Sequence, residues 1–279
     1  MRAAGTIMAV VLMTTGLVIA QEAKVPKGCV AVKGAAISHD GYASGVIHQK
    51  TGVELVLVPA GSFTRGKHKV TIAKPFYVGK TEVTNAQYKR FITQSGYDGR
   101  KDVDPAYEMY LLHLRGKSIM PSGDNFPVIF VSWRNAKAFC RWAGALDLPT
   151  AGEWEYSCRA GTTGNFHFGN EIGNYPQYGW ATENSGGRPH KVAQLKPNAW
   201  GLHDMHGNVW EWCLDDYWDS NDALPSDGSA RQEAGLMAKA LRGGTWSAAA
   251  RVSRADWRFS SAPTNATNDM GFRLVLRLP

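Results

Sequence analysis

The part of the chain that follows Gly161 constrains the fold most, because it contains almost no regular periodicity. Residues 161–279 are rich in Gly, Asn and Trp, and the spacing typical of helices is essentially gone. Strands do not alternate regularly with helices, which argues against the dinucleotide-binding and barrel folds built on parallel sheets. Long irregular segments lose chain entropy without regular backbone pairing. They therefore need ions, aromatic rings or side-chain hydrogen bonds to fix them.

Short apolar runs before this region predict three strands. Residues 54–59 alternate and end in a turn at 60–62, residues 76–79 form a second short run, and residues 126–131 form a third. Residues 21–50 contain Gly, Ala and Lys without a sustained period. We interpret them as an N-terminal extension or linker ahead of a domain at 51–279.

Three helices are predicted from their N-cap residues. Thr84, Ser132 and Thr150 each precede a helical pattern, and Glu153 completes a capping box with Thr150. Gly144 is a natural stop for the second helix. A chain of 279 residues forms one or at most two globular units, and its core needs no disulfide or metal for stability.

The N-terminus has the features of a secretory signal peptide. Arg2 precedes an apolar stretch at 7–20, and Val18 and Ala20 occupy the small-residue positions of a cleavage site before Gln21. The stretch is too short to span a bilayer comfortably, and no Cys follows it to carry a lipid. We expect residues 1–20 to be a signal peptide and the mature protein to be periplasmic or secreted, without a membrane partner.

The four cysteines permit two disulfides in an oxidising compartment, and their spacing does not choose among the three pairings. No CxxC pair is present to indicate a redox dithiol or a zinc knuckle. The cysteines are Cys29, Cys140, Cys158 and Cys213.

The formal net charge of +7 comes entirely from the first hundred residues. They hold 13 Lys and Arg against 5 Asp and Glu, a balance of +8, whereas residues 101–279 hold 18 against 19, a balance of −1. The lysines are scattered rather than clustered with stacking aromatics. We interpret them as a solvated face and expect no nucleic-acid partner.

Residues 201–212, GLHDMHGNVWEW, contain donors of the kind that fix an irregular loop. Asp204 and Glu211 are hard oxygen donors, and Gly207 and Val209 offer backbone carbonyls, a set that suits Ca²⁺ rather than zinc. A capped turn with solvated acids is the alternative, and spacing alone leaves both open.

Two further groups of polar residues have ordinary interpretations. His203 and His206 form an HxxH in a Gly-rich turn, which favours loop histidines over a zinc pair. The acidic residues Asp215, Asp216, Asp219 and Asp222 are interpreted as a solvated loop.

A series of ordered motifs resembles the sulfatase-modifying-factor family, the family of formylglycine-generating enzymes. The resemblance covers residues 51–279. The motifs are LVPAGSF (57–63), EVTNAQY (82–88), FPVIFVSW (126–133), LPTAGEWEY (148–156), KPN (196–198) with GL (201–202), GNVWEW (207–212), LRGGTW (241–246) and GFR (271–273).

This resemblance implies an α+β domain of the C-type-lectin-like kind with little regular secondary structure and bound Ca²⁺. It implies that Asp204 and Glu211 bind the ion by side chain, and Gly207 and Val209 by carbonyl. A second calcium site of vertebrate-type members is not carried over, because residues 178–192 are too short for its arrangement.

The chain departs from the family at the two cysteines that bind Cu(I) in the copper-dependent enzymes. The corresponding positions, two and seven residues after Trp246, are Ala248 and Ser253. A methyl group cannot bind a metal, and a hydroxyl does not replace a soft thiolate on Cu(I). We therefore expect no copper and no formylglycine formation by the copper mechanism.

The resemblance also suggests which residues line a site. Trp210 and Thr245 are similar to a Trp and a Ser that line the family's active-site groove, and with Ser253 they are the catalytic candidates. Residues 247–258, SAAARVSRADWR, contain cationic, hydroxyl and aromatic side chains suited to an anionic or ring-containing ligand. The ligand-binding candidates are Trp246, Ser247, Arg251, Arg254 and Trp257. The alternative is that internal acids pair with Arg254 and Arg258 and that Trp257 packs in the core.

Two classes of function follow. The first is a copper-free, oxidoreductase-type tailoring enzyme that acts on a peptide or small molecule outside the cytoplasm. The second is a binding module whose C-terminal loops recognise a glycan, peptide or protein without turnover. The persistence of Trp210 and Thr245 favours the enzyme. The oligomeric state is not predicted.

Overall fold

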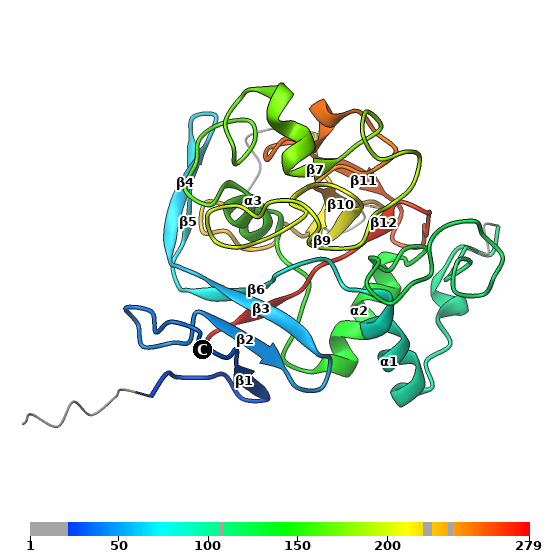
Figure 1. Cartoon of the computed structure of the whole chain (residues 1–279), viewed down its shortest axis with the longest axis horizontal. Coiled ribbons are helices and arrows are strands. Elements are labelled where there is room, and N and C mark those ends of the chain that lie inside the picture. The colour runs from blue at the N-terminus through cyan, green and yellow to red at the C-terminus, as the bar shows by residue number, and fades with distance from the viewer. Residues whose placement is uncertain (1–21, 107–108, 220–224, 234–236) are drawn as a thin grey trace, which may run out of the picture.

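The main sheet contains strands from both ends of the described chain. The structure, a computed structural model, describes residues 22–106, 109–219, 225–233 and 237–279. Five antiparallel strands follow one another in the order β1-β2-β3-β6-β13, and Figure 1 shows the last strand, in red, beside β6. Their bounds are β1 (Cys29–Ala31), β2 (Gly45–His48), β3 (Val53–Val58), β6 (Phe76–Gly79) and β13 (Val275–Arg277).

A second sheet of four strands carries most of the irregular C-terminal part. Its order is β11-β10-β9-β12, in which β9 (Trp210–Asp216) pairs antiparallel with β10 (Lys239–Arg242) and parallel with β12 (Met270–Gly271). β11 (Phe259–Ser261) forms its edge. The hairpin of β4 (Gly61–Arg65) and β5 (His68–Ile72) and the short parallel pair of β7 (Gly179–Trp180) and β8 (His206–Gly207) complete the described strands.

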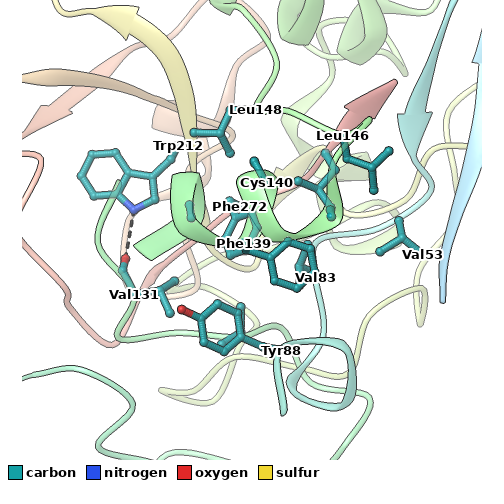
Figure 2. Packing of buried hydrophobic residues seen from close by; sticks show 14 of the residues in the cluster. Val53, Val83, Tyr88, Val131, Phe139, Cys140, Leu146, Leu148, Trp212 and Phe272 are labelled. Atoms are coloured by element: carbon teal, nitrogen blue, oxygen red, sulfur yellow. Dashed lines mark hydrogen bonds between the residues drawn. The ribbon is translucent and has the colours of Figure 1, made fainter. Parts of the chain in front are cut away.

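The three predicted helices are confirmed with their caps. Thr84, Ser132 and Thr150 form capping boxes at the starts of α1 (Asn85–Ser95), α2 (Trp133–Ala143) and α3 (Ala151–Arg159). Figure 2 shows Phe139 and Cys140 of α2 among the side chains of the largest core cluster, with the indole N–H of Trp212 donating to the carbonyl of Val131 at 3.0 Å.

The short helices are 3₁₀ turns: η1 (Gly99–Asp102), η2 (Ile172–Gln177) and η3 (Ala250–Ser253). After Gly161 the described residues contain only two such turns and strands of two to seven residues. The predicted loss of helical period is therefore confirmed, and so is the α+β class with little regular secondary structure.

The strand predicted at residues 126–131 is wrong. The segment is buried, but its amides bond to two different parts of the chain: Val128 N–H donates to Val83 O at 2.8 Å and Phe130 N–H to Thr267 O at 2.9 Å. Phe130 also has a φ of +55°, which is outside the strand region. The apolar run correctly predicted that this segment is buried, but its backbone is not a strand.

Part of the predicted extension at 21–50 belongs to the main sheet. β2 pairs with β3 along its whole length, from Gly45 opposite Val56 to His48 opposite Val53, and β1 adds to β2. The short strands escaped prediction because they have too few residues to establish a period.

The cysteines are all free thiols in this structure. Cys140, Cys158 and Cys213 are buried and Cys29 is half-buried, so the disulfides that the sequence permits are not formed. The predicted signal peptide at 1–20 lies outside the described residues. Among the residues from 22 onward that the structure describes, no helix has the length and apolar character needed to cross a membrane.

The segment between η1 and α2 is attached to α1 through a buried histidine. His113 Nε2 lies 2.9 Å from Asn85 Oδ1, and because a carboxamide oxygen only accepts, the histidine donates. The His113 ring also packs at 5.7 Å from the Phe130 ring. Burial lowers the pKa of His113 to about 4, with Lys89 contributing in the same direction.

We predict that His113 makes the protein less stable in acid. The pKa of His113 is about 4 in the folded state and about 6.5 in the unfolded state. The neutral ring therefore contributes fully to stability above pH 6.5, and this contribution is lost as the pH falls toward 4. Between pH 7 and pH 5 the wild type should lose about 2 kcal/mol more than His113→Gln, whose amide can still donate to Asn85. Urea unfolding at both pH values measures this difference, and parallel pH profiles would contradict it.

Candidate functional site

A buried ion pair lies at the centre of the Gly-rich motif. Glu211 on β9 receives two hydrogen bonds from Arg273, Nε to Oε2 at 2.6 Å and Nη2 to Oε1 at 2.6 Å, and both side chains are fully buried. The indole N–H of Trp154 on α3 donates to the same Oε2 at 2.7 Å. Arg273 also donates to the carbonyls of Gly79 and His203.

Two further carboxylates lie in this interior with incomplete hydrogen bonding. Glu82 accepts from Asn208 Nδ2 at 3.0 Å and Asp204 accepts from the Ala193 amide at 2.7 Å. Their remaining oxygens, Glu82 Oε2 and Asp204 Oδ1, are buried without a hydrogen-bond partner. Burial raises the pKa of both carboxyl groups. The charges of Asp204 and Glu211 raise the pKa of Glu82 further, and the charge of Glu211 raises that of Asp204. Three buried carboxyl groups, those of Glu82, Asp204 and Glu211, therefore lie around one guanidinium, that of Arg273.

The catalytic candidates Thr245 and Ser253 are interior residues. Both are buried, and Ser253 Oγ accepts from Tyr175 Oη at 3.1 Å while its backbone carbonyl lies 2.7 Å from His206 Nδ1. Gly244 packs directly against Ser253, since a Cβ at that glycine would lie 2.0 Å from the hydroxyl. In this conformation neither hydroxyl faces a ligand from solution.

The two tryptophans of the candidate site are also largely inside. Trp210 is stacked against the exposed Phe259 ring at 5.2 Å, and Trp246 donates from its indole to Asn268 O at 3.2 Å. Trp246 belongs to a small core cluster with Ile129, Phe130 and Val209.

The ligand-binding candidates divide into paired and unpaired side chains. Arg254 pairs with Asp256 at 3.1 Å, but both side chains of this pair are about one-third or more exposed. The guanidinium carbon of Arg254 lies 5.2 Å from the centre of the Trp257 ring, which is half-buried against the largest core cluster. Arg251 is exposed, and within the described residues its side chain has no hydrogen bond or ion pair. Ser247 is exposed and donates to Asp269 at 3.1 Å.

A carboxylate that no sequence motif predicted reaches this segment from far along the chain. Residues 181–185 lie against residues 246–250: Ser185 Oγ donates to Trp246 O at 2.8 Å and Thr182 N–H to Ala248 O at 3.0 Å. Between them, both oxygens of the exposed Glu183 lie 3.1 Å from the Ala250 amide. No local motif identifies this residue, because its partner is 67 positions away.

The remaining polar groups are structural. His203 and His206 bond to backbone carbonyls, as expected of loop histidines, and burial lowers the pKa of His206 to about 3. Asp215 and Asp216 are buried rather than solvated: Asp215 accepts from the first amide of α3 at 2.7 Å. The solvated-loop interpretation is wrong for these two. Asp222 lies outside the described residues.

Comparison with known proteins identifies the family. The model of the sulfatase-modifying factor enzyme 1-like domain matches residues 44–278. The chain belongs to this family. The match includes β2, in agreement with the place of that strand in the main sheet.

Relatives of this sulfatase-modifying-factor protein include both active and inactive enzymes. It is 28% identical to the formylglycine-generating enzyme of Streptomyces coelicolor, over 78% of this chain and 87% of that one. It is 27% identical to the inactive Cα-formylglycine-generating enzyme 2 of Bos taurus, over 79% and 87%. The structure of PvdO from Pseudomonas aeruginosa is 28% identical, with a TM-score of 0.69 over 82% of this chain and 96% of that one. Overall identity therefore does not decide the chemistry.

Two of the four calcium ligands that the family implies, Asp204 and Glu211, keep oxygen lone pairs that a cation could use. Asp204 Oδ1 is an orphaned buried oxygen, and Glu211 Oε1 accepts a single hydrogen bond and keeps a lone pair. No group of three or more His, Cys, Asp or Glu side chains in the described part is arranged to hold a metal. A cation here would therefore need the carbonyls of Gly207 and Val209, as the resemblance implies.

We predict that breaking the Glu211–Arg273 pair strongly destabilises this protein. Arg273→Met leaves a carboxylate buried without its counter-charge, and the expected loss is about 3–5 kcal/mol. Lys80→Met is the matched control, because the Lys80–Glu54 pair at 2.8 Å is more than one-third exposed and should contribute about 0–1 kcal/mol. Urea unfolding measures both, and a loss below about 1 kcal/mol for Arg273→Met would show that the pair is not central.

Proposed function

We propose that this protein is an exported, copper-free tailoring enzyme of the sulfatase-modifying-factor family that acts on a peptide or small molecule. Export is supported by the signal-peptide pattern at residues 1–20. The absence of copper chemistry is supported by Ala248 and Ser253 at the positions of the thiolate pair. A buried hydroxyl that already accepts from Tyr175 offers no soft ligand to Cu(I).

The observation that carries the proposal is the position of Glu183. Its carboxylate is exposed and accepts a hydrogen bond from the Ala250 amide. Ala250 lies between positions 248 and 253, which correspond to the two cysteines of the copper-dependent relatives. An exposed carboxylate held in a fixed position can accept a proton from a substrate C–H, N–H or O–H group and return it later. The hydroxyl of Ser247 and the guanidinium of Arg251 are exposed nearby in the chain and can orient that substrate.

The experiment compares three purified proteins on a pool of secreted peptides and small molecules. Wild type and Glu171→Gln should produce the same new masses with a Cu(I) chelator present, whereas Glu183→Gln should reduce their rate at least about a hundredfold. Glu171 is the control because it is exposed and makes no side-chain capping bond. Mass spectrometry of the pool gives the readout.

Two outcomes would contradict the proposal. One is the conversion of a cysteine-containing sulfatase peptide to the aldehyde with Cu(I) and O₂, which would restore the copper mechanism. The other is retention of a glycan or peptide without any turnover, lost in Arg251→Ala. The second outcome would establish the alternative of a binding module, which the unpaired Arg251 favours.

We also propose Ca²⁺ as a structural cofactor bound by Asp204, Gly207, Val209 and Glu211. The ion would neutralise part of the buried negative charge and join the loop at 204–209 to β9. EGTA should lower the melting temperature of the wild type by several degrees, and excess Ca²⁺ should restore it. Asp204→Asn should be less stable than wild type and much less sensitive to EGTA. An unchanged wild-type melt in EGTA would exclude the ion.

A further inference from the structure

A separate hollow opens between the end of α1 and the segment that follows η1. Its volume is about 660 Å³, and a smaller hollow of about 240 Å³ adjoins it, since Arg100, Tyr110, Arg115 and Lys117 line both. None of the residues 245–258 lines either hollow. The site is therefore distinct from the one described above.

Four cationic side chains, those of Lys89, Arg100, Arg115 and Lys117, line the two hollows, against two acidic ones, those of Asp98 and Asp104. Lys89 pairs with Asp124 at 2.9 Å, and Arg100 pairs with Asp98. Arg115 and Lys117 are exposed, and within the described residues neither side chain has an ion pair or a hydrogen bond. Two unpaired cations at one hollow favour a ligand with negative charge.

Arg115 is also oriented by an aromatic ring. Its guanidinium carbon lies 5.1 Å from the centre of the Tyr110 ring, which is 3% exposed and therefore fixed in the interior. A cation held over a ring loses less side-chain entropy when it binds an anion, because one face of the guanidinium is already packed. The fork of N–H donors remains available to a carboxylate or a phosphate.

Part of the lining of the hollow is apolar. Ile92 and Leu114 are half-buried there and Leu111 is buried. Leu111 has a φ of +50°, a conformation that leucine rarely adopts, and its amide donates to Phe130 O at 3.0 Å. Such strained residues are concentrated at ligand sites, where the surrounding structure holds them in place.

We propose that this hollow binds a small anion that carries an aromatic or branched aliphatic group. Arg115 and Lys117 would contact the carboxylate or phosphate monoester, and Ile92, Leu111 and Leu114 would contact the apolar part. The pairing of exposed cations with a hydrophobic wall selects against neutral and cationic compounds of the same shape. The proposal does not depend on the chemistry at Glu183.

Calorimetric titration of the full mature chain with three probes tests the proposal. The probes are 3-phenylpropionate, phenyl phosphate and neutral 3-phenylpropanamide. At least one of the two anions should bind about tenfold or more tightly than the amide, and the better anion identifies the charged group. Raising NaCl from about 0.02 M to about 0.5 M should weaken the anion and leave the amide unchanged.

Variants locate the binding site. The double variant Arg115→Gln, Lys117→Gln should reduce anion affinity to that of the amide, and because both side chains are exposed its unfolding midpoint should not change. Lys67→Gln, an exposed lysine in the β4–β5 turn, should bind like wild type. Failure of both anions to bind, equal affinity for acid and amide, or full affinity in the double variant would each overturn the proposal.

Discussion

The buried pair of Glu211 and Arg273 is the interaction on which the rest of the structure depends. It connects the central strand of the second sheet to the residues that lead into the last strand of the main sheet. Trp154 attaches α3 to the same carboxylate, and Arg273 reaches the backbone of Gly79 at the end of β6. One ion pair therefore fixes two sheets and a helix relative to one another. Such a pair is costly to desolvate and still more costly to break.

A second buried cluster has the opposite charge balance and lies beside the first. Glu155 accepts from Arg159 and Arg242 at 2.7 Å each, and Arg65 approaches it at 3.3 Å. The guanidinium carbon of Arg242 lies 5.2 Å from the centre of the Trp154 ring, whose N–H donates to the acidic cluster. Trp154 therefore lies between buried charges of both signs. Arginines and aromatic rings supply much of the fixation that an irregular chain needs, as its composition indicated.

The candidate site depends on how the segment after Trp246 packs against the rest of the fold. Ser253 packs inward against Gly244 and Tyr175, so this position belongs to the interior. The exposed carboxylate next to this segment belongs to Glu183, which lies on a different loop and accepts from the Ala250 amide. The anion hollow proposed near Arg115 is separate, since none of the residues 245–258 lines it.

The sequence by itself determined the family, the three capped helices, the strands at 54–59 and 76–79 and the absence of cysteine at positions 248 and 253. Those features depend on neighbouring residues, and local hydrogen bonds and residue types fix them. The tertiary structure alone decided that residues 126–131 bond to two separate segments, that β1 and β2 join the main sheet, and that Glu183 meets Ala250. These contacts join residues far apart in the chain, and no local pattern specifies which distant amide or carboxylate will supply the partner.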